Sequence, residues 1–95
     1  MGLTEARTVA FSLGGEVARA DLPAIYERVC DLLRTSGATT VLCDVKGLTS
    51  DAVSLDALAR VCLAARRHGC RLRLRHTSHD LTGLIAFAGL EDVLE

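Results

Sequence analysis

The sequence predicts a small α/β domain with a mixed sheet of three to four strands and about three to four helices. Strand-like and helix-like patterns alternate along the chain in the order β-α-β-α-β-α, which is typical of this class. At 95 residues the chain has the length of one domain, so we expect a single domain over 1–95. Helical crossovers make successive strands parallel, but a first strand at the sheet edge can run the other way, hence a mixed sheet.

The first strand and the first helix are expected between residues 7 and 37. Apolar and polar side chains alternate over 7–13, which predicts a strand with one half-exposed face. Asp21 suits the N-cap of a helix, and Pro23 fits its first turn because the missing N–H costs nothing there. Gly37 is expected to end this helix.

The stretch 39–69 reads as one strand–turn–helix unit. The apolar run 41–43 is short and is followed by turn residues at 46–51, which suggests a strand buried on both faces. Helical spacing of apolar residues resumes at Leu55, so Ser54 is the simplest N-cap. The expected core stripe of this helix comprises Leu55, Leu58, Cys62 and Ala65, with Val61 at its edge.

The last third of the chain predicts one more strand and one more helix. Over 70–75 the apolar residues alternate with arginines, so one strand face is apolar and the other is a row of guanidinium groups. Ser78 or Asp80 can cap the following helix, which stops at Gly89. A final turn over 90–95 is expected to pack Leu90, Val93 and Leu94.

Charge and targeting signals narrow the class of protein. The formal net charge of −1 argues against a nucleic-acid or membrane-surface partner. The N-terminal residues contain no apolar run of signal-peptide length, and the longest later run, 84–90, is too short to cross a bilayer. We therefore expect a cytoplasmic protein without membrane insertion. Between Ala57 and His79 the chain carries six arginines and no acid, so its charge is unevenly distributed.

No motif points to an enzyme, a metal or a cofactor. The four cysteines form no CxxC pair and have no histidine at zinc-finger spacing, so we expect inert buried thiols. Neither the dinucleotide fingerprint nor the Walker pattern is present. The histidines are expected to face solvent, and no nucleophile has a positioned base. Asp51 and Asp56 are expected to stabilise the positive end of the central helix dipole.

Four features of the chain form a recognisable pattern: the strand end at Asp44, the turn 47–49, the helix start 51–58 and a Gly-Leu pair at 89–90. In these residues the chain resembles the STAS domain family of anti-sigma factor antagonists and sulphate-transporter tails. The resemblance implies a STAS-like fold and a non-enzymatic protein-interaction module. The implied partner is an anti-sigma factor kinase or similar regulator, whose binding would relieve inhibition of transcription, or a component of a transport system. A homodimer is compatible with the sequence.

The phospho-acceptor of the family is not retained in this chain. In switchable members a Ser or Thr directly after an Asp is phosphorylated by the partner kinase. Aligning Asp51 with that Asp puts Ala52 in the acceptor position, and the alternative alignment puts Val53 there. Ser54 is the best remaining hydroxyl, but capping is the simpler role for it. The implied contact surface comprises Thr49, Ser50, Asp51, Ala52, Ser54 and Arg60.

An alternative function uses the basic strand. Alternation places Arg71, Arg73 and Arg75 on one face, next in sequence to the basic residues 66–68. Guanidinium groups bind phosphate and carboxylate well, so this row is a candidate anion site, or an acidic-partner site in a transporter-associated subunit. The simpler interpretation is a solvated outer face that also discourages edge pairing.

Overall fold

Three strands pair in chain order and form a parallel sheet. The computed structural model describes residues 7–90, with β1 (Thr8–Ser12), β2 (Thr40–Asp44) and β3 (Arg71–Arg75) in the order β1-β2-β3. Both pairings are parallel, so the expected mixed sheet is wrong for the described residues. The physical reason is that a helix lies in each connection and returns the chain to the same end of the sheet before the next strand begins.

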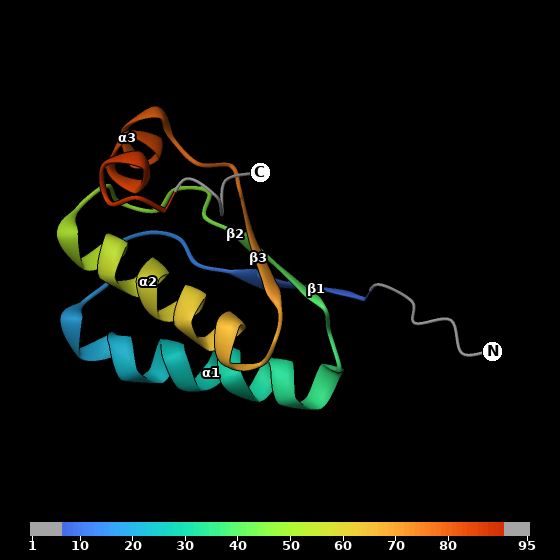
Figure 1. The fold of residues 1–95 in the computed structure, drawn as a ribbon. Helices are drawn as coiled ribbons and strands as arrows, with labels where there is room; N and C mark the ends of the chain where they lie inside the picture. Colours follow the sequence, from blue (N-terminus) through green and yellow to red (C-terminus); the bar gives the residue numbers. More distant parts are fainter. Residues whose placement is uncertain (1–6, 91–95) are drawn as a thin grey trace.

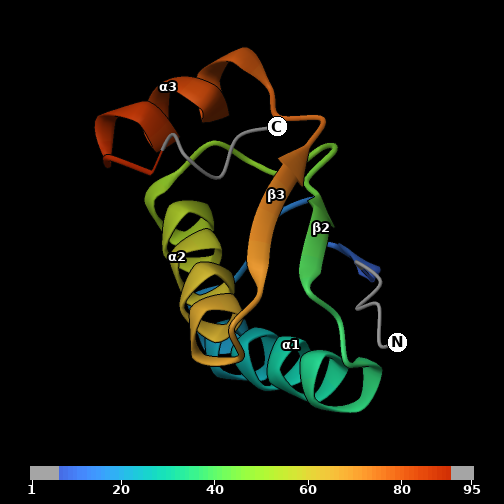
Figure 2. The ribbon, with the colours of Figure 1, turned by 45° about the vertical axis from the view of Figure 1, so that its right-hand side comes forward.

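Three helices and one short 3-10 turn complete the fold, in agreement with the expected number. The turn η1 (Arg19–Asp21) leads into α1 (Leu22–Ser36), which connects β1 to β2. The second connection contains α2 (Ala52–Arg67), and α3 (His79–Phe87) follows β3. Figures 1 and 2 show α1 and α2 on the same side of the sheet, and α3 close to the start of α2.

The covered face of the sheet builds the core with α1 and α2. Val41 and Cys43 of β2 are fully buried, whereas Leu42 and its neighbours on the other face are only half-buried. The expectation that the central strand is buried on both faces is therefore wrong. Right-handed crossovers place consecutive helices on one face when strands are added in chain order, so no helix among the described residues packs across the other face.

Local signals define the ends of the helices. Gly37 and Gly69 follow α1 and α2 with φ of 65° and 67°, the left-handed conformation that ends a helix. Ser78 caps α3, since its Oγ accepts from the N–H of Leu81 at 3.1 Å. Asp21 does occupy the N-cap position of α1, but its carboxylate accepts from the N–H of Ala18 instead of capping.

The C-terminal prediction is tested only in part. Leu90 is half-buried and packs against the core, as expected, and its N–H donates to the carbonyl of Ile85 at 3.0 Å. Val93 and Leu94 lie outside the described residues. None of the helices between residues 7 and 90 combines the length and apolarity needed to cross a bilayer.

Candidate functional site at the start of α2

The turn before α2 is fixed by hydrogen bonds to two other parts of the chain. The backbone N–H and the hydroxyl of Thr49 both donate to the carbonyl of Gly15, each at 3.0 Å. The Oγ atoms of Ser50 and Ser78 are 3.3 Å apart, which joins the turn to the cap of α3. Both hydroxyl groups of the turn therefore have partners within the fold.

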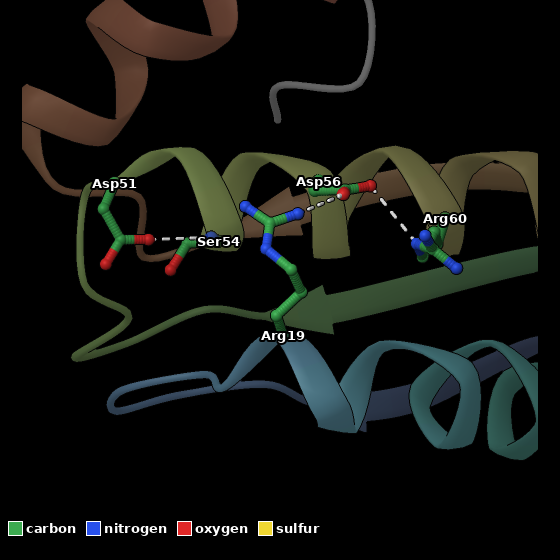
Figure 3. Close-up of polar contacts among 5 residues, drawn as sticks. All are labelled: Arg19, Asp51, Ser54, Asp56 and Arg60. Carbon is green, nitrogen blue, oxygen red and sulfur yellow. Dashed lines mark hydrogen bonds and ion pairs between the residues drawn. The ribbon is translucent and has the colours of Figure 1, made fainter.

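Asp51, and not Ser54, is the N-cap of α2. Asp51 has an extended backbone, and its Oδ1 accepts from the N–H of Ser54 at 2.8 Å (Figure 3). The helix thus begins at Ala52, three residues before the apolar spacing becomes visible at Leu55. The expected capping role of Ser54 is wrong because an earlier residue already supplies the oxygen that the first turn needs.

Ser54 lies in the core rather than on the candidate surface. Its side chain is 0% exposed, and its Oγ has no hydrogen-bond partner within the described part of the chain. A kinase cannot reach this hydroxyl in the folded protein, and a dianionic phosphate would be buried without a countercharge. Ser54 therefore cannot belong to a contact surface, which corrects its place among the expected contact residues.

Ala52 occupies the exposed first position of α2. It is adjacent to the capping carboxylate of Asp51 and follows the anchored turn. A methyl group stands here at the positive end of the helix dipole, where an anion or a phosphorylated hydroxyl would be electrostatically favoured. The position is accessible to a partner but offers no phosphorylation chemistry.

Asp56 links α2 to the turn that precedes α1. Its carboxylate accepts from Nε of Arg60 at 3.2 Å and lies 3.7 Å from a guanidinium nitrogen of Arg19 (Figure 3). Asp56 lies beyond the first turn of α2, so the prediction that it stabilises the helix dipole is wrong. Its carboxylate forms these ion pairs instead. The side chains are partly exposed, so the pairs contribute little stability, up to about 1 kcal/mol each.

An outer stripe of α2 continues from Ala52 towards the C-terminal end of the helix. Residues at helical spacing share this face, and Leu63 is 46% exposed on it. A shallow hollow of about 430 Å³ adjoins the stripe between α2 and α1. It is lined by Tyr26, Asp56, Ala59, Arg60, Leu63 and Arg67. We name Ala52, Asp56, Ala59, Arg60 and Leu63 the α2 docking surface.

Sequence reasoning assigned only part of this surface to a contact role. It singled out Ala52 and Arg60, but it missed Leu63, Ala59 and the neighbouring Tyr26 of α1. The signal was available for the residues of α2, because 52, 56, 59 and 63 follow the four- and three-residue steps of one helix face. The contribution of Tyr26 depends on how α1 packs beside α2, which the sequence does not state.

The basic strand has the alternation that the sequence predicts. Leu72 and Leu74 are buried on the covered face, whereas Arg71 and Arg75 are exposed and Arg73 is half-buried on the other. A hollow of about 490 Å³ lies beside the strand. It is lined by Gly69–Arg73 of the chain leading into and along β3 and by three residues of α2, namely Cys62, Ala65 and Arg66.

A negative charge stands at the far end of this arginine row. Asp44 is paired in register with Arg75, and its carboxylate lies 3.0 Å from Nδ1 of His76. The hydrogen bond with His76, followed by one from the N–H of Lys46, lowers the pKa of Asp44. Asp44 is therefore ionised at neutral pH and disfavours a second anion at that end, so Arg71 and Arg73 offer the better site.

Burial holds for three of the four cysteines, whereas Cys30, expected to be buried as well, is half-buried. All four are free, and Cys43, Cys62 and Cys70 are buried. Burial, with a smaller contribution from Asp44, raises the pKa of Cys43 to about 12. Burial also raises the pKa of Cys70, whose thiol donates to the carbonyl of Ala38 at 3.0 Å. Among residues 7–90, no group of three or more His, Cys, Asp or Glu could hold a metal ion.

Comparison with known proteins adds no family assignment. No family model and no curated protein matches this sequence. The resemblance to STAS domains therefore stays a prediction, based on the central unit and on the order of the elements.

Proposed function

We propose that this chain is a non-enzymatic protein-interaction module of the STAS kind, which binds its partner through the α2 docking surface and the turn 49–51. By the resemblance, the partner is an anti-sigma factor kinase or similar regulator, or a component of a transport system. Support comes from the geometry of the region: an anchored turn, a capped helix start, and an outer helix stripe that exposes one large apolar side chain. Asp56 and Arg60 line the same hollow as this apolar side chain, which gives the mixture of apolar and charged groups found at contact surfaces.

The observation that carries the proposal is the combination of an exposed Ala52 with a buried Ser54. The accessible position has no hydroxyl, and the nearby hydroxyl is not accessible. We infer that phosphorylation at the start of α2 does not switch this protein, so that partner binding depends on its concentration or on another site.

The test compares a charge placed on the surface with the same charge placed elsewhere. Tagged wild-type protein, Ala52→Glu and the control Ala24→Glu are used to capture partners from the native lysate. Glu is tolerated at the first helical position because it complements the helix dipole, so Ala52→Glu should fold. The control residue is exposed on α1, away from the flank that Tyr26 occupies.

We expect a regulator or transporter component to be retained by wild type and Ala24→Glu, and to be lost with Ala52→Glu. Equal capture by all three proteins would show that the start of α2 is not the interface. Intact mass after incubation with ATP and the captured kinase tests the second part. Stoichiometric phosphate on Thr49, Ser50 or Ser54 would contradict a module that is not switched by phosphorylation.

A second candidate function is supported by the hollow beside β3. Three arginines, Arg66, Arg71 and Arg73, line it and could bind an anionic ligand. Binding that depends steeply on salt and is lost in Arg71→Ala/Arg73→Ala would favour this anion-binding or transporter-associated role. Binding that survives this double change but is lost in Arg60→Ala would favour the interaction module.

A further inference from the structure

Among residues 7–90, no strand pairs with the outer edge of β3. In the described part of the chain β3 is an edge strand, and its only strand partner is β2. The N–H of Arg71 donates to the carbonyl of Thr39 at 2.9 Å, and the carbonyl of Arg75 accepts from Val45 at 3.0 Å. Because backbone groups alternate in direction along a strand, Leu72 and Leu74 direct their N–H and C=O groups to the open edge.

The hollow beside β3 lies along this edge. The residues from Gly69 to Arg73 form one wall, and the C-terminal half of α2 forms the other. In the view of Figure 2, β3 lies between α2 and β2. An extended segment paired with β3 would therefore have a helix beneath it on the covered side and solvent on the other side.

The two sides of this groove differ in chemistry. Side chains of an added strand alternate between the faces, so every second one would stand beside Arg71 and Arg73 on the open face. The others would lie above Cys62, Ala65 and Leu72, which are apolar. A segment that alternates acidic with apolar residues complements both sides.

A second copy of β3 does not satisfy the same requirement. Pairing two β3 edges would place arginine rows next to one another on the open face, and like charges on neighbouring strands are destabilising. The arginines therefore act as a filter, since they disfavour self-pairing and favour a negatively charged strand.

We propose that the edge of β3 binds an extended acidic–apolar segment of a partner protein by strand addition, in the groove between β3 and α2. The main chain of the segment bonds to Leu72 and Leu74, and its acidic side chains face Arg71 and Arg73. This site lies on the flank of α2 opposite the hollow next to Tyr26, so it is independent of the α2 docking surface.

The test uses a capped heptapeptide of alternating Glu and Val, with a peptide of alternating Lys and Val as the charge control. Amide hydrogen exchange and chemical shifts of the isotope-labelled protein are recorded with each peptide. We expect at least tenfold protection of the Leu72 and Leu74 amides with the acidic peptide and none with the basic one. Arg71→Glu should weaken binding at least tenfold, whereas the matched control Arg67→Glu, exposed on the other flank of α2, should change it less than twofold.

N-methylated peptides separate strand pairing from simple charge attraction. One peptide is methylated at the amides of Val and the other at the amides of Glu. In antiparallel pairing the apolar positions bond to β3, and in parallel pairing the acidic positions do. Loss of binding with only one of the two peptides supports strand addition and reports its direction.

Three results would overturn the proposal. The first is equal behaviour of the two methylated peptides. The second is binding of inorganic phosphate or of the peptide without protection of the Leu72 and Leu74 amides, which would assign the hollow to a small anion or to charge alone. The third is protection that grows with protein concentration in the absence of peptide, which would assign the edge to a second copy of the chain. None of these results bears on the capture experiment at Ala52, so the two proposals can fail separately.

Discussion

Ser54→Ala is expected to stabilise the protein, although it removes a hydroxyl group from the core. The Oγ atom of Ser54 is fully buried and has no hydrogen-bond partner within the described residues. Burying an unsatisfied hydroxyl costs about 1–3 kcal/mol in protein mutational data. Alanine also has the higher helix propensity, by about 0.5 kcal/mol. The small void left by one oxygen atom offsets part of this, so we expect a gain of about 1 kcal/mol in the free energy of unfolding.

Urea unfolding and thermal melting followed by circular dichroism measure this change. For a domain of this length, about 1 kcal/mol corresponds to an increase in melting temperature of roughly 4–8 °C. Ala52→Ser is the matched control, because it adds a hydroxyl at the exposed start of the same helix and should change stability by less than about 0.5 kcal/mol. A loss of about 1 kcal/mol in Ser54→Ala would show that Oγ makes a hydrogen bond in the folded protein, and would refute the reasoning.

A charge at the same two positions extends the comparison to phosphorylation. Ser54→Asp places a carboxylate in the core without a partner, and a loss of about 3 kcal/mol or more is expected. Ala52→Asp places it at the exposed end of the helix dipole, where it should be neutral or stabilising by about 0.3–1 kcal/mol. Equal stability of the two variants would mean that Ser54 is accessible after all.

Two further predictions concern the ends of the strands and the glycines. The pKa of Asp44 is held below its ordinary value mainly by His76, so in His76→Gly it should rise, as measured by NMR titration of the carboxyl carbon. A carboxyl group with a lowered pKa stabilises the fold at neutral pH, and this stabilisation is lost as the pH falls through the folded-state pKa. The free energy of unfolding should therefore fall less steeply with acidification in the variant than in the wild type. An unchanged pKa of Asp44 would contradict its hydrogen bond with His76. Gly14→Ala should destabilise, because its Cβ would lie 2.7 Å from the carbonyl oxygen of Lys46. The control Gly83→Ala meets nothing within 4 Å on α3 and should gain up to about 1 kcal/mol in urea unfolding, so equal effects at the two sites would refute the steric argument.

Features that depend on neighbouring residues in the sequence could be predicted well. The strand positions, the helix ends at Gly37 and Gly69, and the alternating faces of β3 follow from local periodicity and from glycine conformation. The start of α2 was predicted less well. Apolar spacing detects the buried stripe of a helix, whereas the first turn of α2 begins with the exposed Ala52, so the pattern became visible one turn too late.

Features that depend on packing between distant segments could not be predicted. The order of the strands determines which sheet face is covered, and a β-α-β pattern alone does not specify that order. The burial of Ser54 depends on segments from elsewhere in the chain, and the contact of Arg19 with Asp56 joins residues in different connections. For this reason the candidate surface lost Ser54 and gained Leu63 and Ala59 once the fold was known.

The hydrogen bonds between Thr49 and Gly15 have a consequence for how tightly a partner can bind. Two donors of one residue hold the carbonyl of the other, and the N–H of Gly15 donates in turn to the carbonyl of Gly47 at 3.1 Å. The loop before α2 is thus ordered when the protein folds, before any partner arrives. Binding does not have to supply the entropy of ordering that loop, so a modest contact area can give useful affinity. The arrangement favours a rigid, preformed recognition element over one that is shaped by its partner.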